Sequence, residues 1–291
     1  MLEFLESLGL DFSVDEGRVC LDESLQLLDE SVIRRQLADM AVIPAAPVIG
    51  IFRTVESTNN EALKALGEPG DGHFLITAEM QTAGKGRRGR HWVSPFGRNV
   101  YMSYARFLQR PLADLGGLSL IAGMEVVEAL RQLGVTGAGL KWPNDVLLDD
   151  GKLAGILVEL KPAEQRGIGV VIGIGINLSL SARHSDLIDQ SWSHLGEWQI
   201  DRSQLIGKLL KRLLLALEQF NREGFAPFAA KWPTYNLYAD TDVRVIRGAE
   251  IFSGKDRGID LHGNLQLETP GGVIESHNSG EVSMRPLESV R

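Results

Sequence analysis

Between residues 48 and 237, segments with strand periodicity alternate with segments that have helical periodicity. The strand patterns lie at 73–80, 99–106, 139–148, 153–160 and 168–178. The longest helical patterns lie at 113–133 and 202–222. This order predicts an α+β fold in which helices pack on a mixed sheet. Residues 241–286 contain five short alternating stretches separated by glycine turns, which predicts a small β-barrel.

The residues before this region form a separate pattern. Residues 10–21 alternate apolar and polar side chains around Asp15, Glu16 and Gly17, which predicts a hairpin. A helical stretch follows at 30–38, and two prolines within 40–47 predict a linker. We therefore expect three units, at 1–39, 40–239 and 240–291.

Composition narrows the classes of function. The chain has 30 Lys and Arg against 38 Asp and Glu, a net charge of −8, which argues against general attachment to nucleic acid. The single cysteine, Cys20, excludes an internal disulfide and a cysteine cage for a metal, and it favours the reducing cytoplasm. The histidines lack metal-ligand spacing. No run approaches the roughly 18 apolar residues of a membrane span, and Glu3 and Glu6 argue against a secretion signal.

The segment from Gly84 to Arg90 (GKGRRGR) holds four cations and three glycines. It matches the G-x-G-x-x-G pattern, but residues 92–104 contain a proline, a glycine and strand alternation where a dinucleotide site needs a helix. Glycines permit close approach of backbone amides to an anion, and the cations neutralise carboxylate or phosphate charge. We therefore expect an anion-binding loop, with Trp92 beside it as a stacking face for a base. The alternative is a solvated basic loop.

A second polar group lies at Lys141-Trp142-Pro143-Asn144-Asp145, followed by Lys152. Pro143 interrupts a strand, so Asn144 and Asp145 are expected at a strand end. A hairpin between the two strands would bring Asp145 and Lys152 together at one site. The alternative is a surface ion pair.

A third feature is the apolar strand 170–177 (VVIGIGIN). Its glycines would let a flat ligand lie against the backbone, and Asn177 could read an amide or base edge. The alternative is a tightly packed strand crossing. No Gly-x-Ser-x-Gly turn occurs, which disfavours covalent hydrolase chemistry.

These motifs together resemble those of biotin protein ligases. The segments that carry the likeness are 56–59 (ESTN), 81–92 (QTAGKGRRGRHW), 94–97 (SPFG), 141–145 (KWPND), 152–159 (KLAGILVE) and 173–177 (GIGIN). The resemblance implies a class II synthetase-like catalytic domain, a mixed sheet flanked by helices, and a C-terminal SH3-like barrel. It also implies that ATP activates biotin to biotinyl-5'-adenylate, from which biotin passes to one lysine of the biotin carboxyl carrier protein of acetyl-CoA carboxylase.

The resemblance also implies roles for individual residues. Biotin would contact Ser57, Thr58, Asn59, Gln81, Gly84, Lys85, Gly86, Arg87 and Lys152. ATP would contact Arg87, Arg90, Trp92, Lys141, Asn144 and Asn177, with Mg²⁺ near Asn144 and no protein cage for the metal. The catalytic residues would be Arg87, Lys152 and Asp145, the last orienting the acceptor amine or accepting its proton. Many members of the family carry arginine where this chain has Lys85. Here the compact ammonium of lysine therefore stands in place of a planar guanidinium group.

The N-terminal segment departs from the bifunctional members of the family, which carry a winged helix-turn-helix. Residues 3–21 resemble only the end of a recognition helix and the wing hairpin, so we do not expect this chain to bind DNA. A homodimer is compatible with the resemblance. The alternatives are a lipoate-type or other carboxylate-to-lysine ligase, and an operon repressor if a longer native form exists.

Overall fold

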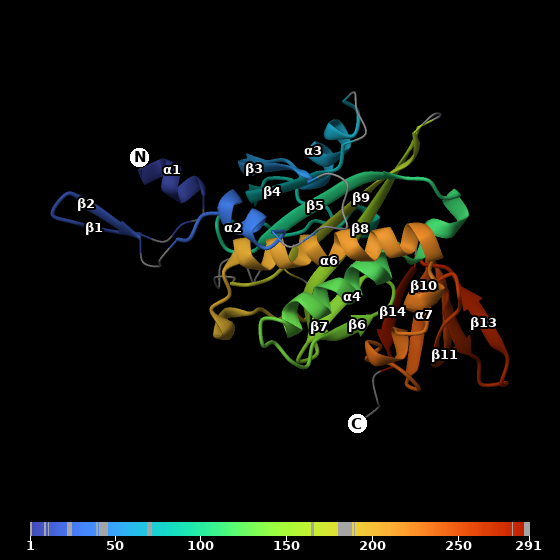
Figure 1. Cartoon of the computed structure of the whole chain (residues 1–291). Coiled ribbons are helices and arrows are strands. Elements are labelled where there is room, and N and C mark those ends of the chain that lie inside the picture. Colours follow the sequence, from blue (N-terminus) through green and yellow to red (C-terminus); the bar gives the residue numbers. More distant parts are fainter. Residues whose placement is uncertain are drawn as a thin grey trace.

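The central element of the protein is a seven-stranded mixed sheet, seen in a computed structural model (Figure 1). The structure describes residues 2–8, 10, 12–21, 25–38, 40, 46–68, 72–163, 166–179, 188, 190–280 and 282–287. In spatial order the strands are β3 (Val48–Val55), β4 (Phe74–Gln81), β5 (Val100–Leu108), β9 (Gly167–Ile176), β8 (Gly151–Ala163), β7 (Asp145–Leu148) and β6 (Gly139–Lys141). β3 and β4 are parallel, whereas the other neighbours are antiparallel. The predicted mixed sheet is confirmed.

Helices cover both faces of this sheet (Figure 1). Successive strand residues point to opposite faces, so Leu75 joins the large core and Ile76 a smaller one. The smaller core packs beneath α3 (Thr58–Ala65). The larger core includes α4 (Leu118–Arg131) and α6 (Arg202–Glu223), whose apolar residues recur at helical spacing. Because helices cover both faces of the sheet, the ends of the strands remain open for a binding site.

The predicted strand 139–148 is two strands. Proline has no N–H to give to a sheet ladder, and the ladder stops at Trp142 and Pro143 between β6 and β7. The turn from β7 to β8 has positive φ at both Asp149 (49°) and Asp150 (62°), as a two-residue hairpin turn of type I′ requires. This tight turn fixes the register of β7 on β8, and thereby places Asp145 beside the start of β8.

The C-terminal region is a five-stranded antiparallel sheet, so the five predicted strands are confirmed. Its order is β13 (Ile274–His277), β12 (Leu265–Glu268), β11 (Glu250–Ile259), β10 (Asp242–Arg247) and β14 (Val282–Pro286). The indole N–H of Trp142, between β6 and β7, donates to the carbonyl of Gly263 at 3.1 Å, which ties this region to the seven-stranded sheet. Closure into an SH3-like barrel stays a prediction.

The N-terminal residues form α1 (Leu2–Ser7), the hairpin of β1 (Phe12–Asp15) and β2 (Arg18–Leu21), and α2 (Glu30–Arg35). The hairpin prediction is confirmed, and the hairpin projects from the body (Figure 1). Most of the predicted linker, residues 41–45, lies outside the described residues.

The remaining helices are short: η1 (Arg87–Gly89), η2 (Leu112–Gly117), η3 (Gly196–Trp198), α7 (Ala226–Ala229) and η4 (Trp232–Thr234). No helix in the described part of the chain is long and apolar enough to cross a membrane.

Candidate active site

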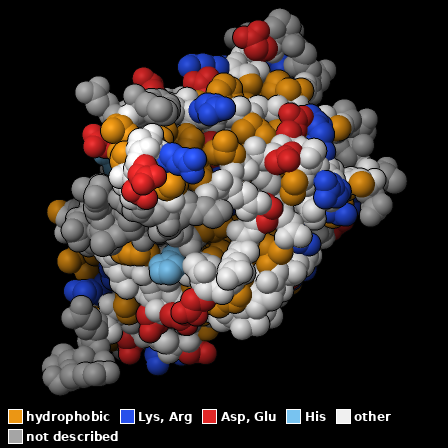
Figure 2. Space-filling view, turned by 90° about the vertical axis from the view of Figure 1, so that its left-hand side faces the viewer, with side chains coloured by type: hydrophobic (Ala, Val, Ile, Leu, Met, Phe, Trp, Pro, Cys, Tyr) orange, Lys and Arg blue, Asp and Glu red, His pale blue; other side chains and the backbone are white. Residues whose placement is uncertain are grey.

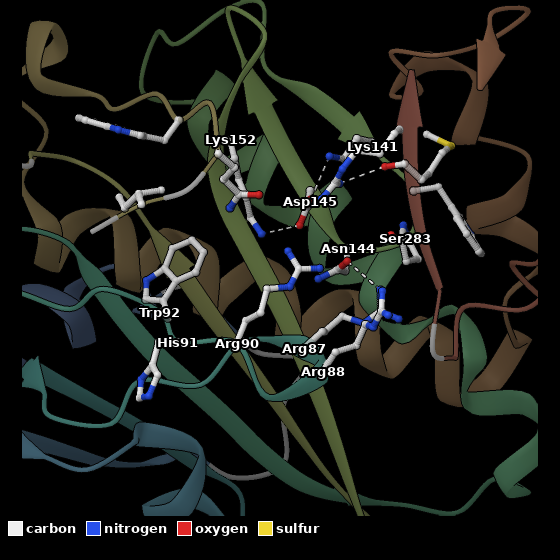
Figure 3. Close-up of a pocket in the computed structure, with 18 of the residues that line it drawn as sticks. Arg87, Arg88, Arg90, His91, Trp92, Lys141, Asn144, Asp145, Lys152 and Ser283 are labelled. Atoms are coloured by element: carbon white, nitrogen blue, oxygen red, sulfur yellow. Dashed lines mark hydrogen bonds and ion pairs between the residues drawn. The ribbon is translucent and has the colours of Figure 1, made fainter. Parts of the chain in front are cut away.

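Two adjoining cavities open where the cationic loop faces β7, β8 and the end of β9 (Figure 3). The larger has a volume of about 320 Å³ and the smaller about 50 Å³. They share one wall, made by Gly86, Arg87, Trp92, Asn144 and Lys152. A ligand in one cavity would therefore meet a ligand in the other at two cationic side chains.

Neutral polar side chains line the smaller cavity. Thr58 donates its backbone N–H and its hydroxyl to Oε1 of Gln81, at 2.8 and 3.1 Å. Asn59 accepts from the hydroxyl of Ser103 at 2.6 Å and donates to Glu159 at 2.6 Å. These bonds fix an array of donors and acceptors that suits a ligand with a urea or amide group.

Ser57 directly precedes α3 in the N-cap position, but its side chain does not cap the helix. Its side chain makes no capping hydrogen bond, and Glu61 pairs with Lys64 at 2.7 Å instead. Ser57 is buried and lines the smaller cavity. Its hydroxyl is therefore available to a ligand.

The cationic loop folds back on itself. The N–H of Gly86 donates to the carbonyl of Arg90 at 2.7 Å, and the N–H of Trp92 donates to the carbonyl of Gly84 at 2.9 Å. A Cβ on Gly84 would lie 2.4 Å from the carbonyl oxygen of Trp92, so only glycine fits there. Arg90 lines the larger cavity, and Lys85 lines the smaller one while pairing with Glu159 at 3.5 Å.

Arg87 is the most embedded arginine of the loop. Its guanidinium donates to Oδ1 of Asn144 at 2.9 Å and to the carbonyls of Ser279 and Gly280, in the turn between β13 and β14. Burial lowers the pKa of Arg87, although Asp145 nearby opposes that shift. The guanidinium stays charged because arginine has so high an ordinary pKa. The loop thus contacts both the KWPND segment and the C-terminal sheet.

Asp145 lies between two lysines, which is the predicted meeting of Asp145 and Lys152 (Figure 3). Its Oδ1 is 2.7 Å from Nζ of Lys152 and its Oδ2 is 3.3 Å from Nζ of Lys141. The three side chains are only 11–14% exposed, so the surface ion pair of the alternative interpretation is wrong. Burial opposes ionisation of the carboxyl, but the two ammonium groups outweigh it and lower the pKa of Asp145. Burial also lowers the pKa of Lys141.

Trp92 occupies the face of the glycine-rich strand. A Cβ on Gly175 would lie 2.4 Å from the indole, and a Cβ on Gly155 would lie 2.9 Å from it. In this structure the indole of Trp92, and not a ligand, covers the backbone at Gly175. Nζ of Lys152 lies 5.4 Å from the indole centre, a cation–π distance that keeps ring and ammonium together.

Asn177 directly follows β9 and contacts Lys152. Its side-chain amide donates to the carbonyl of Lys152 at 3.2 Å, and the backbone of Lys152 bonds Ser191 and Ser193 at 3.0 and 3.1 Å. Trp192, next in that segment, lines the larger cavity. These contacts hold the start of β8 in a fixed position.

Sequence reasoning missed several lining and supporting residues. Ser94, Ser103 and Glu159 support the smaller cavity, and Ile188, Gln190, Trp192 and Arg285 line the larger one. Arg285 comes from β14, far along the chain from the loop. Six cationic residues line the larger cavity: Arg87, Arg88, Arg90, Lys141, Lys152 and Arg285. Among the described lining residues Asp145 is the only acidic one, so the cavity suits a polyanion.

Comparison with known families agrees with this geometry. Residues 51–177 match the biotin/lipoate A/B protein ligase family, and residues 242–285 match the biotin protein ligase C-terminal domain. The fold and the two matched regions are therefore those of ligases of the biotin and lipoate class.

Individual relatives narrow the class. A bifunctional ligase/repressor BirA of Salmonella typhimurium is 42% identical over 99% of this chain and 88% of its own length. A biotin–[acetyl-CoA-carboxylase] ligase of Mycobacterium tuberculosis is 35% identical over 89% of this chain and 96% of its own. The biotin protein ligase of Aquifex aeolicus in complex with biotin and ATP superimposes with a TM-score of 0.67 and 29% identity, covering 82% of this chain and 99% of that one. This chain belongs to the biotin protein ligase family.

Proposed function

We propose that this chain activates biotin with ATP to biotinyl-5'-adenylate and transfers biotin to a lysine of a biotin carboxyl carrier protein. The wall shared by the two cavities is the observation that carries the proposal. The neutral polar side chains of the smaller cavity suit the ureido ring of biotin, and the larger cavity, with its six cationic residues, suits ATP. The carboxylate of biotin would then meet the α-phosphate beside Arg87 and Lys152.

The first step joins two anions, so the protein must supply positive charge and alignment. The biotin carboxylate attacks the α-phosphorus, a C–O–P bond forms, and pyrophosphate leaves with the electron pair of the broken P–O bond. Lys152 and Arg87 would neutralise the carboxylate and the α-phosphate, and Lys141, Arg90 and Arg285 would hold the other phosphates. The indole of Trp92 would cover adenine, with Asn177 reading its edge.

We propose that Mg²⁺ accompanies the triphosphate. The described residues contain no group of three or more acidic, histidine or cysteine side chains that could hold a metal ion. Both oxygens of Asp145 face ammonium groups, and Oδ1 of Asn144 accepts from Arg87. Because these oxygens already face cations, Mg²⁺ would take its main ligands from phosphate oxygens and water. The second lone pair of Asn144 Oδ1 is the candidate protein ligand.

In the second step the carrier lysine attacks the acyl carbon of the adenylate and AMP leaves. An ordinary lysine has a pKa near 10.4, so the amine must lose a proton first. Asp145 is a weak base because two lysines lower its pKa. Of the two roles expected for Asp145, the structure favours orienting the amine over accepting its proton.

A mass measurement tests the proposal. A carrier domain incubated with this protein, ATP and biotin should gain the mass of one biotinyl group, whereas lipoate in place of biotin should give no adduct. If the carrier is labelled with lipoate and not with biotin, the substrate of this protein is lipoate. Labelling by neither acid, with a carrier that a known ligase modifies, would refute the function.

A repressor function is not favoured. In the view that faces the N-terminal hairpin side, basic and acidic side chains are interspersed (Figure 2), where a duplex would require a basic face. The hairpin is present, but its origin as the wing of a DNA-binding unit stays a prediction. So do the unit boundaries at residues 39 and 239, the homodimer and the identity of the carrier. We propose the cytoplasm as the place of action because the reaction consumes ATP.

A further inference from the structure

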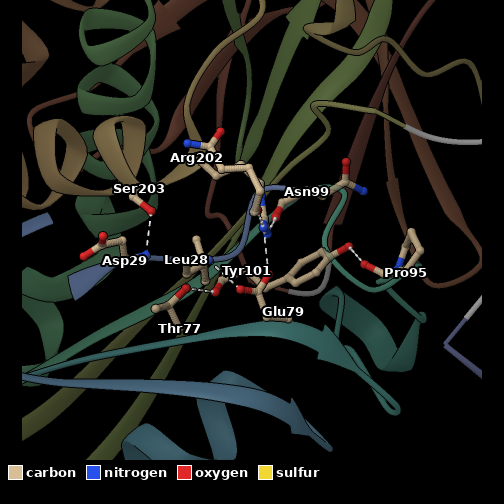
Figure 4. Close-up of polar contacts among 10 residues, drawn as sticks. Leu28, Asp29, Thr77, Glu79, Pro95, Asn99, Tyr101, Arg202 and Ser203 are labelled. Atoms are coloured by element: carbon tan, nitrogen blue, oxygen red, sulfur yellow. Dashed lines mark hydrogen bonds and ion pairs between the residues drawn. The ribbon is translucent and has the colours of Figure 1, made fainter. Parts of the chain in front are cut away.

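A buried ion pair lies where β4, β5 and α6 meet (Figure 4). Glu79 on β4 and Arg202 at the start of α6 have side chains only 4% and 7% exposed, and they bond at 2.7 Å. Glu79 also accepts from the N–H of Leu28 at 2.6 Å, and Arg202 donates to the carbonyl of Gln26. Neither charged side chain lines the two cavities. Their burial therefore needs an explanation other than contact with substrate.

Asn99 connects this pair to the site. Arg202 donates to the backbone carbonyl of Asn99 at 3.3 Å. The side chain of Asn99 is buried, and its Oδ1 accepts from the N–H groups of Leu178 and Ser179 at 2.8 and 3.1 Å. Those two residues directly follow Asn177, which lines the larger cavity and bonds Lys152. Asn99 thus fixes the direction in which the chain leaves β9.

We propose that Asn99 is a positioning residue for the nucleotide half of the site, and that the Glu79–Arg202 pair holds Asn99 in place. This inference rests on the proposed function. Without Oδ1 of Asn99, two backbone N–H groups at the end of β9 lose their partner, and a buried donor without a partner is costly. The chain would relax there, and Asn177 would lose its fixed position against Lys152.

Other side-chain hydrogen bonds hold the biotin half of the site. Gln81 donates to Ser94 at 3.0 Å, and Thr58 and Asn59 are held by Ser103. None of these contacts includes Asn99 or Arg202. A loss of Asn99 should therefore weaken nucleotide binding selectively, which general damage to the fold would not do.

Titration calorimetry on the full chain tests the proposal, with biotin and a non-hydrolysable ATP analogue as separate ligands. Asn99→Ala should raise the Kd of the ATP analogue about tenfold, the effect expected for two lost hydrogen bonds, and leave the Kd of biotin within about twofold. Asn99→Asp keeps the acceptor oxygen, and the two backbone N–H groups that donate to it also stabilise a carboxylate, so the affinity for the analogue should largely return.

Ser203→Ala is the matched control. Ser203 is buried at the same end of α6 and accepts from the N–H of Asp29 at 2.9 Å, but this hydrogen bond does not involve Asn99. This variant should leave both Kd values unchanged. Arg202→Lys replaces the guanidinium with one nitrogen, so it should weaken binding of the analogue in the same selective way, to a smaller degree.

Three results would overturn the inference: equal weakening of both ligands by Asn99→Ala, no rescue by Asn99→Asp, or selective loss of nucleotide in Ser203→Ala. If only Arg202→Lys has no effect, the part assigned to the ion pair is wrong. The proposed function is judged separately, by whether the wild-type protein labels a carrier. A wild type that binds both ligands and labels nothing would refute that function and leave the Kd comparison valid.

Discussion

Removing the ammonium of Lys152 should separate its structural role from its chemical one. Lys152→Met keeps most of the side-chain stem and deletes the charge 2.7 Å from Oδ1 of Asp145. At an effective dielectric constant near 20, unit charges at that separation attract by roughly 6 kcal/mol before desolvation is subtracted. Deleting one partner of a buried pair typically costs about 3–5 kcal/mol. Because Lys141 remains 3.3 Å from Oδ2, we expect a loss of about 3 kcal/mol in unfolding free energy, at the lower end of that range.

The rate of the first step should fall by more than stability explains. A cation that neutralises the reacting carboxylate and phosphate is worth about 3–4 kcal/mol of barrier, so adenylate formation should slow by about 10² to 10³. The double variant Lys152→Met/Asp145→Asn removes both charges. It should recover only part of the lost stability, because the buried Lys141 then loses its carboxylate partner, and it should not recover the rate.

Urea unfolding measures the stability of wild type and variants, and single-turnover release of pyrophosphate measures adenylate formation. The reasoning fails if the double variant regains both stability and the normal rate of pyrophosphate release. Lys152 would then serve only as the partner of Asp145, and another cation would have to act on the reacting carboxylate.

Further predictions concern the neighbouring residues. Asp145→Asn should slow transfer to the carrier more than pyrophosphate release; equal slowing in single-turnover kinetics would assign Asp145 to the fold or to Mg²⁺. Arg87→Gly removes the bonds to Asn144 and the 279–280 turn, so adenylate should escape faster, as measured by its release into solution. Gly175→Ala should displace Trp92 and weaken ATP binding about tenfold or more, while Gly271→Ala, whose Cβ would meet its nearest neighbour at 3.9 Å, should not; equal Kd values would refute this. The pKa of Asp145 is lowered, so its ionisation stabilises the fold fully above its ordinary value of 3.8, and this stabilisation is lost as pH falls through the lower folded value. In Asp145→Asn the free energy of unfolding should therefore fall less steeply with decreasing pH.

Much of the fold and part of the site follow from local sequence. Periodicity places the strands and helices, because each face of an element must be buried or solvated along its whole length. The pairing of Asp145 with Lys152 is also local, since a two-residue turn between adjacent strands fixes their register. The glycines and cations of residues 84–90 predict an anion site wherever that loop lies.

Other features depend on segments far apart in the chain. The Asp145–Lys152 pair is buried and forms a cluster with Lys141. The local sequence does not predict how exposed this pair is. Arg285 reaches the cavity only because the C-terminal sheet packs beside β6 and β7, where Trp142 bonds Gly263. Ser57 looks like a helix cap in sequence but lines the smaller cavity.

The position of Trp92 against Gly155 and Gly175 also depends on segments far apart in the chain. The sequence alone determined which residues could bind an anion, stack on a base or pair their charges, because residue chemistry and short-range geometry are local. The tertiary structure decided which of them meet and how far water is excluded from them, because burial and electrostatic strength depend on everything that packs around a group.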